Sequence, residues 1–351
     1  MEEYAVDANS AIELALVDDK NRSLASFYPD FTYPIFGEQE RIFGYKDLHL
    51  QLRMNQTDMR MLVLAEYGDK AADSDEVDPL DRLREYAPED VYVDEASFIQ
   101  DVSSDASPPG ISIFSYQTTE GTFDVYKSDL SDERTRDIMS RVHLLVLFLI
   151  EGGSGIDLDD AKWECYFLYQ TNPQRFMGFA TVYPYYWFHP RISTHRRLRI
   201  SQFLVLPPYR GRGYGAKLYE GLYRHLRSRR EVMEITVEDP SERFDDLRDR
   251  CDLALLERDH VFDRLVAPVS PEWMHSTRQA YKLAPVCVMM TLLIIASAGA
   301  VYGDGLTATA RQVGCSSIQG IPPPRQIKNL QPKQGRWRHG MTLMTRTCSH
   351  K

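Results

Sequence analysis

A glycine-rich turn at residues 210–216 has the residue types and spacing to bind a phosphate group. Its sequence, Arg-Gly-Arg-Gly-Tyr-Gly-Ala, lies between an apolar segment and an amphipathic one. Glycines let the backbone turn tightly and aim several N–H groups at one point, and the positive end of a following helix dipole strengthens the attraction. Arg210 and Arg212 add counter-charge. The turn therefore suits a diphosphate, with a tight connection that binds no ligand as the alternative.

The spacing of the glycines excludes two common phosphate-binding loops. A dinucleotide fold requires Gly-x-Gly-x-x-Gly, whereas Gly211, Gly213 and Gly215 occupy every second position. A Walker loop requires Gly-Lys followed by Ser or Thr, which this turn lacks. The pattern that fits is Arg/Gln-x-x-Gly-x-Gly/Ala, matched by Arg210, Gly213 and Gly215. This is the acetyl-CoA loop of GNAT acetyltransferases, and the sequence resembles that superfamily at this point.

Acidic residues directly after the apolar segment 232–237 could carry acid–base chemistry. An acid at the end of a strand can act as a general base, whereas acids before a helix usually cap it. Asp239, followed by Pro240 and Glu242, has the spacing of a capping box with Pro at the first helical position. We therefore expect Asp239 to cap a helix and Glu238 to be free for chemistry. A solvated surface acid is the alternative for Glu238.

Hydrophobic patterning predicts the strands and helices that would hold these residues. The segments expected to form strands are 59–66, two stretches of 111–126 around Gly121, 163–169, 179–188, 198–206 and 232–237. The segments expected to form helices are 131–150, 215–227 and the one that begins at Ser241. Strands followed by alternating strands and helices indicate a mixed α/β or α+β sheet.

Charge and turn composition divide the chain into three parts. Residues 103–110 cluster Ser, Asp, Pro and Gly and are the expected hinge between an N-terminal α+β domain at 1–110 and a second domain at 111–270. The net charge is −18 before Pro271 and +8 from there on, so 271–351 is expected to be an irregular basic tail.

The tail contains an uncharged apolar run at 285–302, whose 18 residues reach the lower limit for spanning a membrane. The open alternatives are a membrane helix, which we do not favour, a buried helix, and an altered reading of the gene such as a retained intron or a shifted frame.

Overall composition excludes several functional classes. The net charge of −10 argues against direct binding of nucleic acid and fits a basic partner. The five cysteines form no CxxC pair or His/Cys cluster, so neither a metal site nor a disulfide framework is expected. Acidic residues near the N-terminus and the lack of an apolar segment there argue against a signal peptide.

The sequence resembles, more narrowly, the family of type B histone acetyltransferase catalytic subunits. The stretches that carry this resemblance are 9–17, 36–46, 180–186, 201–205 and 236–240. The resemblance extends to about Leu283, beyond which the family normally continues with a charged helical segment that this chain lacks. It implies an α+β GNAT acetyltransferase fold, with a mixed, mostly antiparallel sheet flanked by helices.

The resemblance also implies an activity and a set of site residues. The activity is transfer of acetyl from acetyl-CoA to lysines in the N-terminal tail of newly synthesised histone four, by direct attack with Glu238 as the general base. The residues it assigns to acetyl-CoA are Phe203, Leu204, Val205, Arg210, Gly211, Arg212, Gly213, Tyr214, Gly215, Ala216, Ser241 and Arg250. The residues it assigns to the histone tail are Glu38, Glu40, Tyr183, Pro184 and Tyr185, of which the tyrosines could equally be a core stripe.

Partners and location follow from the same resemblance. It implies histone four together with histone three, a WD-repeat β-propeller subunit that binds histones, and a distribution between cytoplasm and nucleus. Two rival functions stay open. One is a histone-binding escort that has lost turnover, and the other is a GNAT enzyme that acetylates a small amine.

Overall fold

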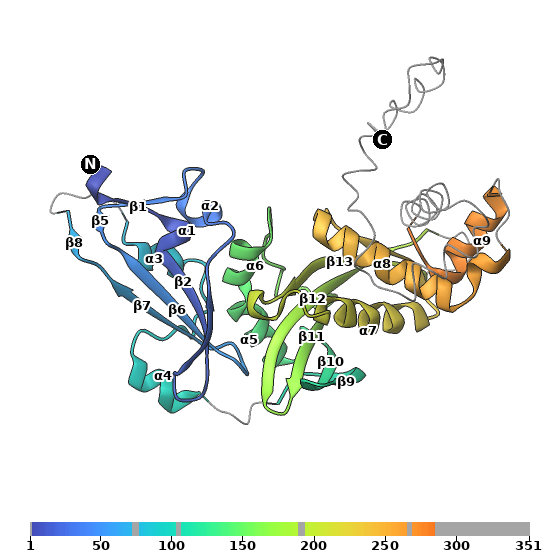
Figure 1. Ribbon diagram of the computed structural model, residues 1–351, viewed down its shortest axis with the longest axis horizontal. Helices are drawn as coiled ribbons and strands as arrows, with labels where there is room; N and C mark the ends of the chain where they lie inside the picture. The colour runs from blue at the N-terminus through green and yellow to red at the C-terminus, as the bar shows by residue number, and fades with distance from the viewer. Residues whose placement is uncertain (1, 72–76, 103–106, 189–193, 265–268, 285–351) are drawn as a thin grey trace, which may run out of the picture.

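The computed structural model describes residues 2–71, 77–102, 107–188, 194–264 and 269–284. Figure 1 shows two α+β parts, an N-terminal unit and a larger sheet with its own helices, with α5 and α6 between them. The apolar run 285–302 and part of the expected hinge at 103–110 lie outside the described residues. Among the residues described, no helix is long and apolar enough to cross a membrane.

The N-terminal unit is built on a four-stranded sheet of order β3-β2-β6-β7, in which β2 and β6 run parallel. Its strands are β2 Ile12–Val17, β3 Ser23–Phe27, β6 His49–Asn55 and β7 Met61–Glu66. The smaller elements are η1 Glu2–Tyr4, β1 Ala5–Asp7, α1 Ala8–Ala11, α2 Tyr33–Phe36, β4 Arg41–Phe43, β5 Tyr45–Lys46, β8 Asp69–Lys70, α3 Pro79–Arg84 and α4 Glu95–Asp101. Strand β7 confirms the strand expected at 59–66.

The second part is a six-stranded sheet of order β14-β13-β12-β11-β10-β9. Its strands are β9 Ile111–Thr118, β10 Gly121–Asp129, β11 Glu164–Thr171, β12 Gln174–Tyr186, β13 Arg196–Val205 and β14 Val232–Val237. All neighbours are antiparallel except β13 and β14, which are parallel. The mixed, mostly antiparallel sheet and the strands on either side of Gly121 are as predicted.

Helices flank both faces of this sheet (Figure 1). They are α5 Glu133–Arg141, α6 His143–Leu149, η2 Pro207–Tyr209, α7 Tyr214–Ser228, α8 Glu242–Arg258, η3 Val261–Arg264 and α9 Pro271–Tyr281. The helix predicted at 131–150 is interrupted at Val142, whose ψ of 0° ends α5 before α6 begins. The helices predicted from residues 215 and 241 are confirmed by α7 and α8.

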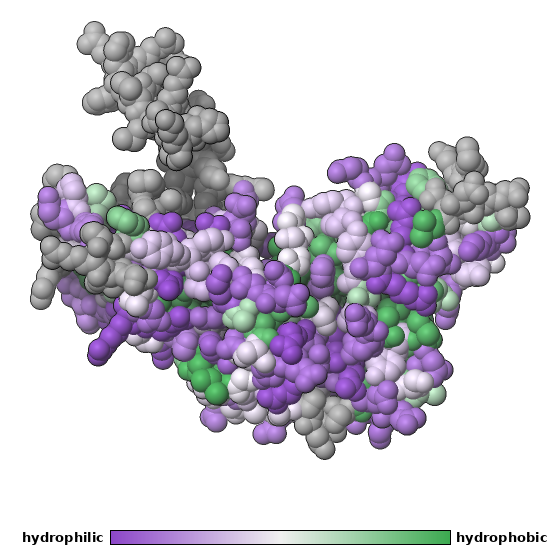
Figure 2. Space-filling model, turned by 180° about the vertical axis from the view of Figure 1, so that it is seen from behind, coloured by the Kyte–Doolittle hydropathy of each residue, from purple (hydrophilic) through white to green (hydrophobic). Residues whose placement is uncertain are grey.

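The two parts share one apolar core. On one face of the sheet, Phe167 and Phe179 belong to a cluster that also contains Leu14 and Leu52 of the N-terminal unit and Phe148 of α6. Side chains on the opposite face pack instead against α7 and α8. Burial of apolar area is the main stabilising term in folding, so the N-terminal unit is held on the sheet by the same interaction that forms each part. The face seen in Figure 2 is mainly hydrophilic, with hydrophobic residues in scattered patches.

Residues 271–284 pack against the large sheet, although their composition belongs to the basic tail. The N–H of Ile235 donates to the Lys282 carbonyl at 2.8 Å, and Ile235 forms a parallel bridge with Leu283. The hydroxyl of Tyr223 donates to the carbonyl of Tyr281. The break in charge near Pro271 therefore does not coincide with the end of the packed chain.

A carboxyl group is buried where α7 packs against α8. Asp252 is 2% exposed and accepts a hydrogen bond of 2.9 Å from the Tyr219 hydroxyl through Oδ1. Its Oδ2 atom has no hydrogen-bond partner among the described residues. Burial raises the pKa of Asp252 to about 7, against the opposing effects of the Tyr219 hydroxyl and the Arg248 guanidinium, and Asp249 raises it further.

Asp252→Asn is expected to stabilise the fold at neutral pH. Because the folded-state pKa lies above the ordinary value of 3.8, the folded protein holds a proton that the unfolded chain releases, and wild-type stability falls as pH rises from about 4 to about 7. The variant lacks this loss, so it should gain roughly 1–4 kcal/mol at pH 8 and little at pH 4. Urea unfolding across this range measures the difference. Asp246→Asn, on the half-buried side of the same helix, is the control, and an equal gain there would contradict the assignment to Asp252.

Candidate active site

The strands β13 and β14 separate at one end of the large sheet. Their pairing runs from Arg196 opposite Val232 to Ile200 opposite Val237, and the Glu238 N–H adds a last hydrogen bond of 2.9 Å to the Ile200 carbonyl. Beyond this point β13 continues beside β12 alone. Along 201–205, no described strand pairs with the side of β13 that faces away from β12. Backbone groups on this free edge are available to an extended ligand.

Glu238 lies at the point of separation. Its side chain is 41% exposed, which leaves the carboxylate reachable from solvent. The hydroxyl of Ser201 donates to Oε2, and the Arg199 guanidinium lies 3.6 Å from Oε1. A carboxylate held at both oxygens yet accessible is able to accept a proton from a bound group. Ser201 and Arg199 were not among the predicted site residues, although Ser201 lies within one of the quoted motifs.

Aromatic side chains from β12 lie on the same face as Glu238. The rings of Tyr183 and Tyr185 meet edge to face at 5.1 Å, and the Arg199 guanidinium lies 4.6 Å from the Tyr185 ring centre. Tyr183 is half-buried, packs against Trp163 and donates from its hydroxyl to Asp160 at 2.7 Å. Tyr183 and Tyr185 therefore form an accessible surface on the face of Glu238, rather than a core stripe. Pro184 lies between them on β12 opposite the buried Leu198, so it faces the other side of the sheet.

The predicted glycine turn connects β13 to α7 through η2. Gly211 and Gly213 have φ angles of +79° and +83°, and Gly213 is the N-cap of α7. These left-handed angles favour glycine. Gly215 serves a different purpose, because a Cβ there would lie 2.9 Å from Cδ1 of Leu247 on α8. The turn therefore combines a left-handed entry into α7 with a close approach of α7 to α8.

Backbone N–H groups are the anion-binding elements of this turn. The N–H of Lys217 donates to the Gly213 carbonyl at 3.2 Å, so the N–H groups of Tyr214, Gly215 and Ala216 come before this helical hydrogen bond. The first N–H groups of a helix have no partner within the helix and point along the positive end of its dipole. This geometry fits a phosphate group.

The arginine side chains of the turn are paired with carboxylates. Arg210 donates from Nε to the Val205 carbonyl at 3.0 Å, and its Nη1 lies 3.4 Å from Asp30 of the N-terminal unit. Arg212 lies 3.6 Å from Glu120. Glu120 also accepts a hydrogen bond from the Tyr214 hydroxyl. Arg210 thus ties the turn to β13 and to the N-terminal unit, while Arg212 is the more exposed of the two.

The expectation that Asp239 caps α8 is wrong. The N-cap is Ser241, whose Oγ accepts a hydrogen bond from the Phe244 N–H at 3.3 Å. Asp239 is exposed and has a φ of +33°, which turns the chain between β14 and the helix. The chain turns through Asp239 and Pro240 before α8 begins, so the N-cap lies two residues later than the capping pattern predicted. Arg250 lies exposed farther along α8.

The two predicted glutamates of the N-terminal unit differ in environment. Glu38 is exposed in the turn after α2. Glu40 accepts hydrogen bonds from the N–H groups of Thr32 and Tyr33 at 2.7 and 3.1 Å and from Nδ2 of Asn9 at 3.0 Å. The Thr32 bond, with those from Asn9 and Tyr33, holds the pKa of Glu40 below its usual value. Glu40 therefore accepts hydrogen bonds from backbone N–H groups at the N-terminus of α2, where the Thr32 side chain provides no cap.

Residues 150–162 join the N-terminal unit to β13. The Gly152 N–H donates to the Tyr33 hydroxyl at 2.9 Å, and the Ser154 carbonyl accepts a hydrogen bond of 2.7 Å from Gln202 Nε2. Gln202 also contacts Thr181 of β12. This connection was not predicted, because it depends on residues far apart in sequence with no local pattern in common.

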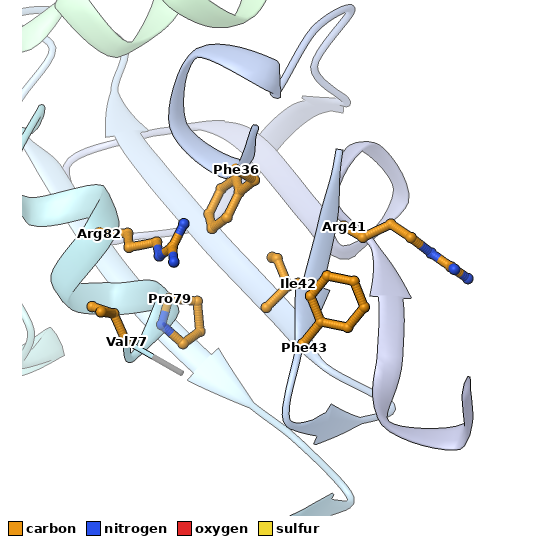
Figure 3. Close-up of a pocket in the computed structure, with 7 residues that line it drawn as sticks. All are labelled: Phe36, Arg41, Ile42, Phe43, Val77, Pro79 and Arg82. Atoms are coloured by element: carbon orange, nitrogen blue, oxygen red, sulfur yellow. The ribbon is translucent and has the colours of Figure 1, made fainter. Parts of the chain in front are cut away.

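A separate pocket of about 170 Å³ lies in the N-terminal unit (Figure 3). Its lining residues are Phe36, Arg41, Ile42, Phe43, Val77, Pro79 and Arg82. In Figure 3 the Arg82 side chain points toward Phe36, whereas Arg41 points away from the pocket. None of the predicted site residues lines it. Among the described residues, no group of His, Cys, Asp and Glu side chains could hold a metal ion.

Three protein-family models match successive parts of the chain. "Histone acetyl transferase HAT1 N-terminus" matches residues 4–151, and "Acetyltransferase (GNAT) family" matches residues 135–244. "Fungal HAT1, C-terminal" matches residues 249–285. The GNAT match contains β11 to β14, the glycine turn and Glu238, and it agrees with the observed sheet.

Several curated proteins named histone acetyltransferase type B catalytic subunit are similar over most of this chain. The one from Candida glabrata is 37% identical over 300 residues, covering 80% of this chain and 76% of its own. Those from Pyricularia oryzae and Neurospora crassa are 36% and 31% identical, covering 75% and 77% of this chain. The alignments cover 65% and 62% of these two relatives, so the chain spans less than two thirds of their length. On this similarity, the chain belongs to the family of histone acetyltransferase type B catalytic subunits.

Proposed function

We propose that the protein transfers acetyl from acetyl-CoA to a lysine side chain in the N-terminal tail of newly synthesised histone four. The observation that carries the proposal is the position of Glu238. This accessible carboxylate lies where β14 ends, beside the free backbone edge at 201–205 and on the sheet whose strand β13 leads into the glycine turn before α7. Membership of the family supports the choice of a histone substrate.

Acetyl-CoA would lie along the free edge of β13 and end at the glycine turn. Phe203, Leu204 and Val205 are the residues whose backbone would pair with the extended pantetheine arm, as an added strand pairs with a sheet edge. The N–H groups at the start of α7 would meet the diphosphate. Ser241 and Arg250 belong to the proposed coenzyme site by family resemblance, and no metal is part of the proposal.

The chemistry requires removal of a proton from the substrate amine. A free lysine has a pKa of about 10.4, so nearly all of it is protonated and non-nucleophilic at neutral pH. Glu238 would take one proton from the ammonium group, directly or through water. The neutral nitrogen would then attack the thioester carbonyl carbon. A carbon–nitrogen bond forms and the carbon–sulfur bond breaks, with its electron pair leaving on sulfur, while a backbone N–H of β13 polarises the carbonyl oxygen. The nitrogen loses its second proton on becoming an amide, and that proton neutralises the departing thiolate.

The surface around Glu238 suits a cationic extended peptide. Tyr183 and Tyr185 offer aromatic faces, and Asp160, bonded to the Tyr183 hydroxyl, offers a carboxylate. The exposed Glu38 of the N-terminal unit belongs to the proposed tail site by family resemblance. The net charge of −18 before Pro271 would attract a basic tail from a distance. The proposal includes histone three bound with histone four, a WD-repeat β-propeller subunit, and a distribution between cytoplasm and nucleus.

Gly213→Asp is expected to weaken acetyl-CoA binding at least tenfold. The substitution places a carboxylate beside the diphosphate and forces a side chain into a left-handed conformation. Calorimetric titration with acetyl-CoA measures the change. Gly37→Asp is the matched control, because Gly37, with a φ of +79° against +83° for Gly213, also has a left-handed backbone and open space around it but lies in the N-terminal unit. Equal affinities of wild type and Gly213→Asp would remove the glycine turn from the site.

Transfer to a histone-tail peptide is expected to slow as salt concentration rises. Exposed charges are screened over about 8 Å at physiological ionic strength, so attraction between the acidic protein and the basic tail weakens above it. Initial rates across a salt series measure this effect. Spermidine at matched salt is the comparison, because it is a polycation without a peptide backbone. A faster reaction with spermidine would favour the small-amine enzyme over the histone acetyltransferase.

Glu238→Gln is expected to lower the rate of transfer by about 10²–10⁴-fold, the usual loss when a general base is removed. Glutamine keeps the shape and hydrogen bonding but does not accept the proton, so binding of acetyl-CoA and of the tail should change little. The deficit should shrink at high pH, where more of the lysine is already neutral. The pH–rate profile of the variant beside wild type measures both effects.

Asp239→Asn distinguishes the two adjacent carboxylates. Asparagine tolerates the positive φ of residue 239, so we expect a much smaller loss than for Glu238→Gln. The larger loss at Asp239 would transfer the role of base to that residue. A wild-type protein that binds the tail without turning over would favour the histone-binding escort.

A further inference from the structure

Strands β12, β13 and β14 place two similar groups of side chains next to each other. In the first, the Arg197 guanidinium lies 4.8 Å from the Trp187 ring centre and 2.7 Å from Oε2 of Glu234. In the second, the Arg199 guanidinium lies 4.6 Å from the Tyr185 ring centre and 3.6 Å from Oε1 of Glu238. Because alternate residues of a strand share a face, both groups lie on the face that carries Tyr183.

The two carboxylates differ in burial and in the number of cations they meet. The Glu234 side chain is 6% exposed, and a second guanidinium, from Arg278 of α9, lies 3.2 Å from its other oxygen. The Glu238 side chain is 41% exposed, and its second oxygen accepts a hydrogen bond from Ser201. The first group is a closed structural ion pair. The second has the same layout but is open to solvent on the side where β13 and β14 separate.

We propose that Arg199 is the positioning residue for Glu238. With Ser201, it holds both carboxylate oxygens in one orientation, and its stacking on Tyr185 fixes the guanidinium in turn. The proposal rests on the assignment of Glu238 as the general base. Arg199 touches neither reacting atom in this assignment, and it acts on the rate only through the carboxylate.

The strength of the contact suits this purpose. A partly exposed ion pair contributes little free energy, so Arg199 orients the carboxylate without binding it too tightly for a substrate ammonium to approach. Misplacing a reacting group by about 1 Å costs roughly 10²-fold in rate. A weak contact that removes one rotational freedom of Glu238 is therefore sufficient to change turnover. The guanidinium lies over the Tyr185 ring, and 38% of Tyr185 is still exposed.

The test compares Arg199→Gln and Arg199→Lys with wild type in steady-state transfer to a histone-tail peptide. We expect Arg199→Gln to lower kcat by 10- to 100-fold with little change in KM for acetyl-CoA, because the free edge of β13 is untouched. Arg199→Lys keeps the charge but loses the planar guanidinium, so it should recover part of the loss. Thermal unfolding of each variant reports whether the fold is intact.

Arg224→Gln is the matched control. Arg224 makes the same two kinds of contact, with Glu220 at 2.7 Å and with the Phe114 ring at 5.1 Å, but lies on α7. Its replacement removes the same charge from the protein and should leave kcat unchanged. An equal loss in both variants would overturn the proposal, because it would mean that net charge, rather than the contact with Glu238, sets the rate.

A double-mutant cycle separates positioning from structural support. In a Glu238→Gln background, Arg199→Gln should cost little more, because the carboxylate it orients is gone. A full additional loss in that background would overturn the role of Arg199 while leaving Glu238 as the base. A normal rate for Glu238→Gln alone would instead overturn the proposed function and this inference with it.

Discussion

The separation of β13 from β14 is the structural constraint on which the rest of the site depends. Strand pairing satisfies backbone groups on both sides of β13 up to Ile200, and only one side beyond it. Strand β14 ends at Val237. The next residue, Glu238, therefore lies beside Ile200, the last residue of β13 that is bonded on this side. The end of the pairing between β13 and β14 therefore produces both the free backbone edge of β13 and the accessible carboxylate of Glu238. The parallel crossover through α7 also brings the glycine turn to the end of β13.

The N-terminal unit matters to this geometry because it is not separately packed. Its core is continuous with that of the large sheet, and polar contacts extend the connection toward the site. Asp30 meets Arg210 at the glycine turn, and Tyr33, whose N–H is held by Glu40, accepts a hydrogen bond from Gly152. The same surface that would face a substrate is thus held by interactions between residues more than 100 positions apart. A mutation at Glu40 would act on the site through this framework.

Local pattern predicted those features that depend on neighbouring residues. The strand at 232–237 and the strands around Gly121 followed from hydrophobic patterning, and a tight glycine turn before a helix followed from the spacing of its glycines. The capping pattern at Asp239 failed because Ser241 offers an equally good cap two residues later, and only the path of the chain selects between them. Arg199 and Glu120 were missed for another reason. Arg199 meets Glu238, and Glu120 meets Arg212, only because the fold brings distant segments together. No local spacing in the sequence indicates such a pair.

The paired groups on β13 and β14 show how similar side chains take different roles according to solvent access. Removing a carboxylate from water is costly unless charges and hydrogen bonds replace the solvent, so Glu234 is met by two guanidinium groups and is held rigidly. Glu238 retains contact with water and needs less compensation, and one guanidinium at 3.6 Å with one hydroxyl suffices. A base must exchange its partners during each turnover, which a closed ion pair resists. Glu238, four residues after Glu234 and just beyond the end of β14, is therefore at a position where a carboxylate is both oriented and accessible.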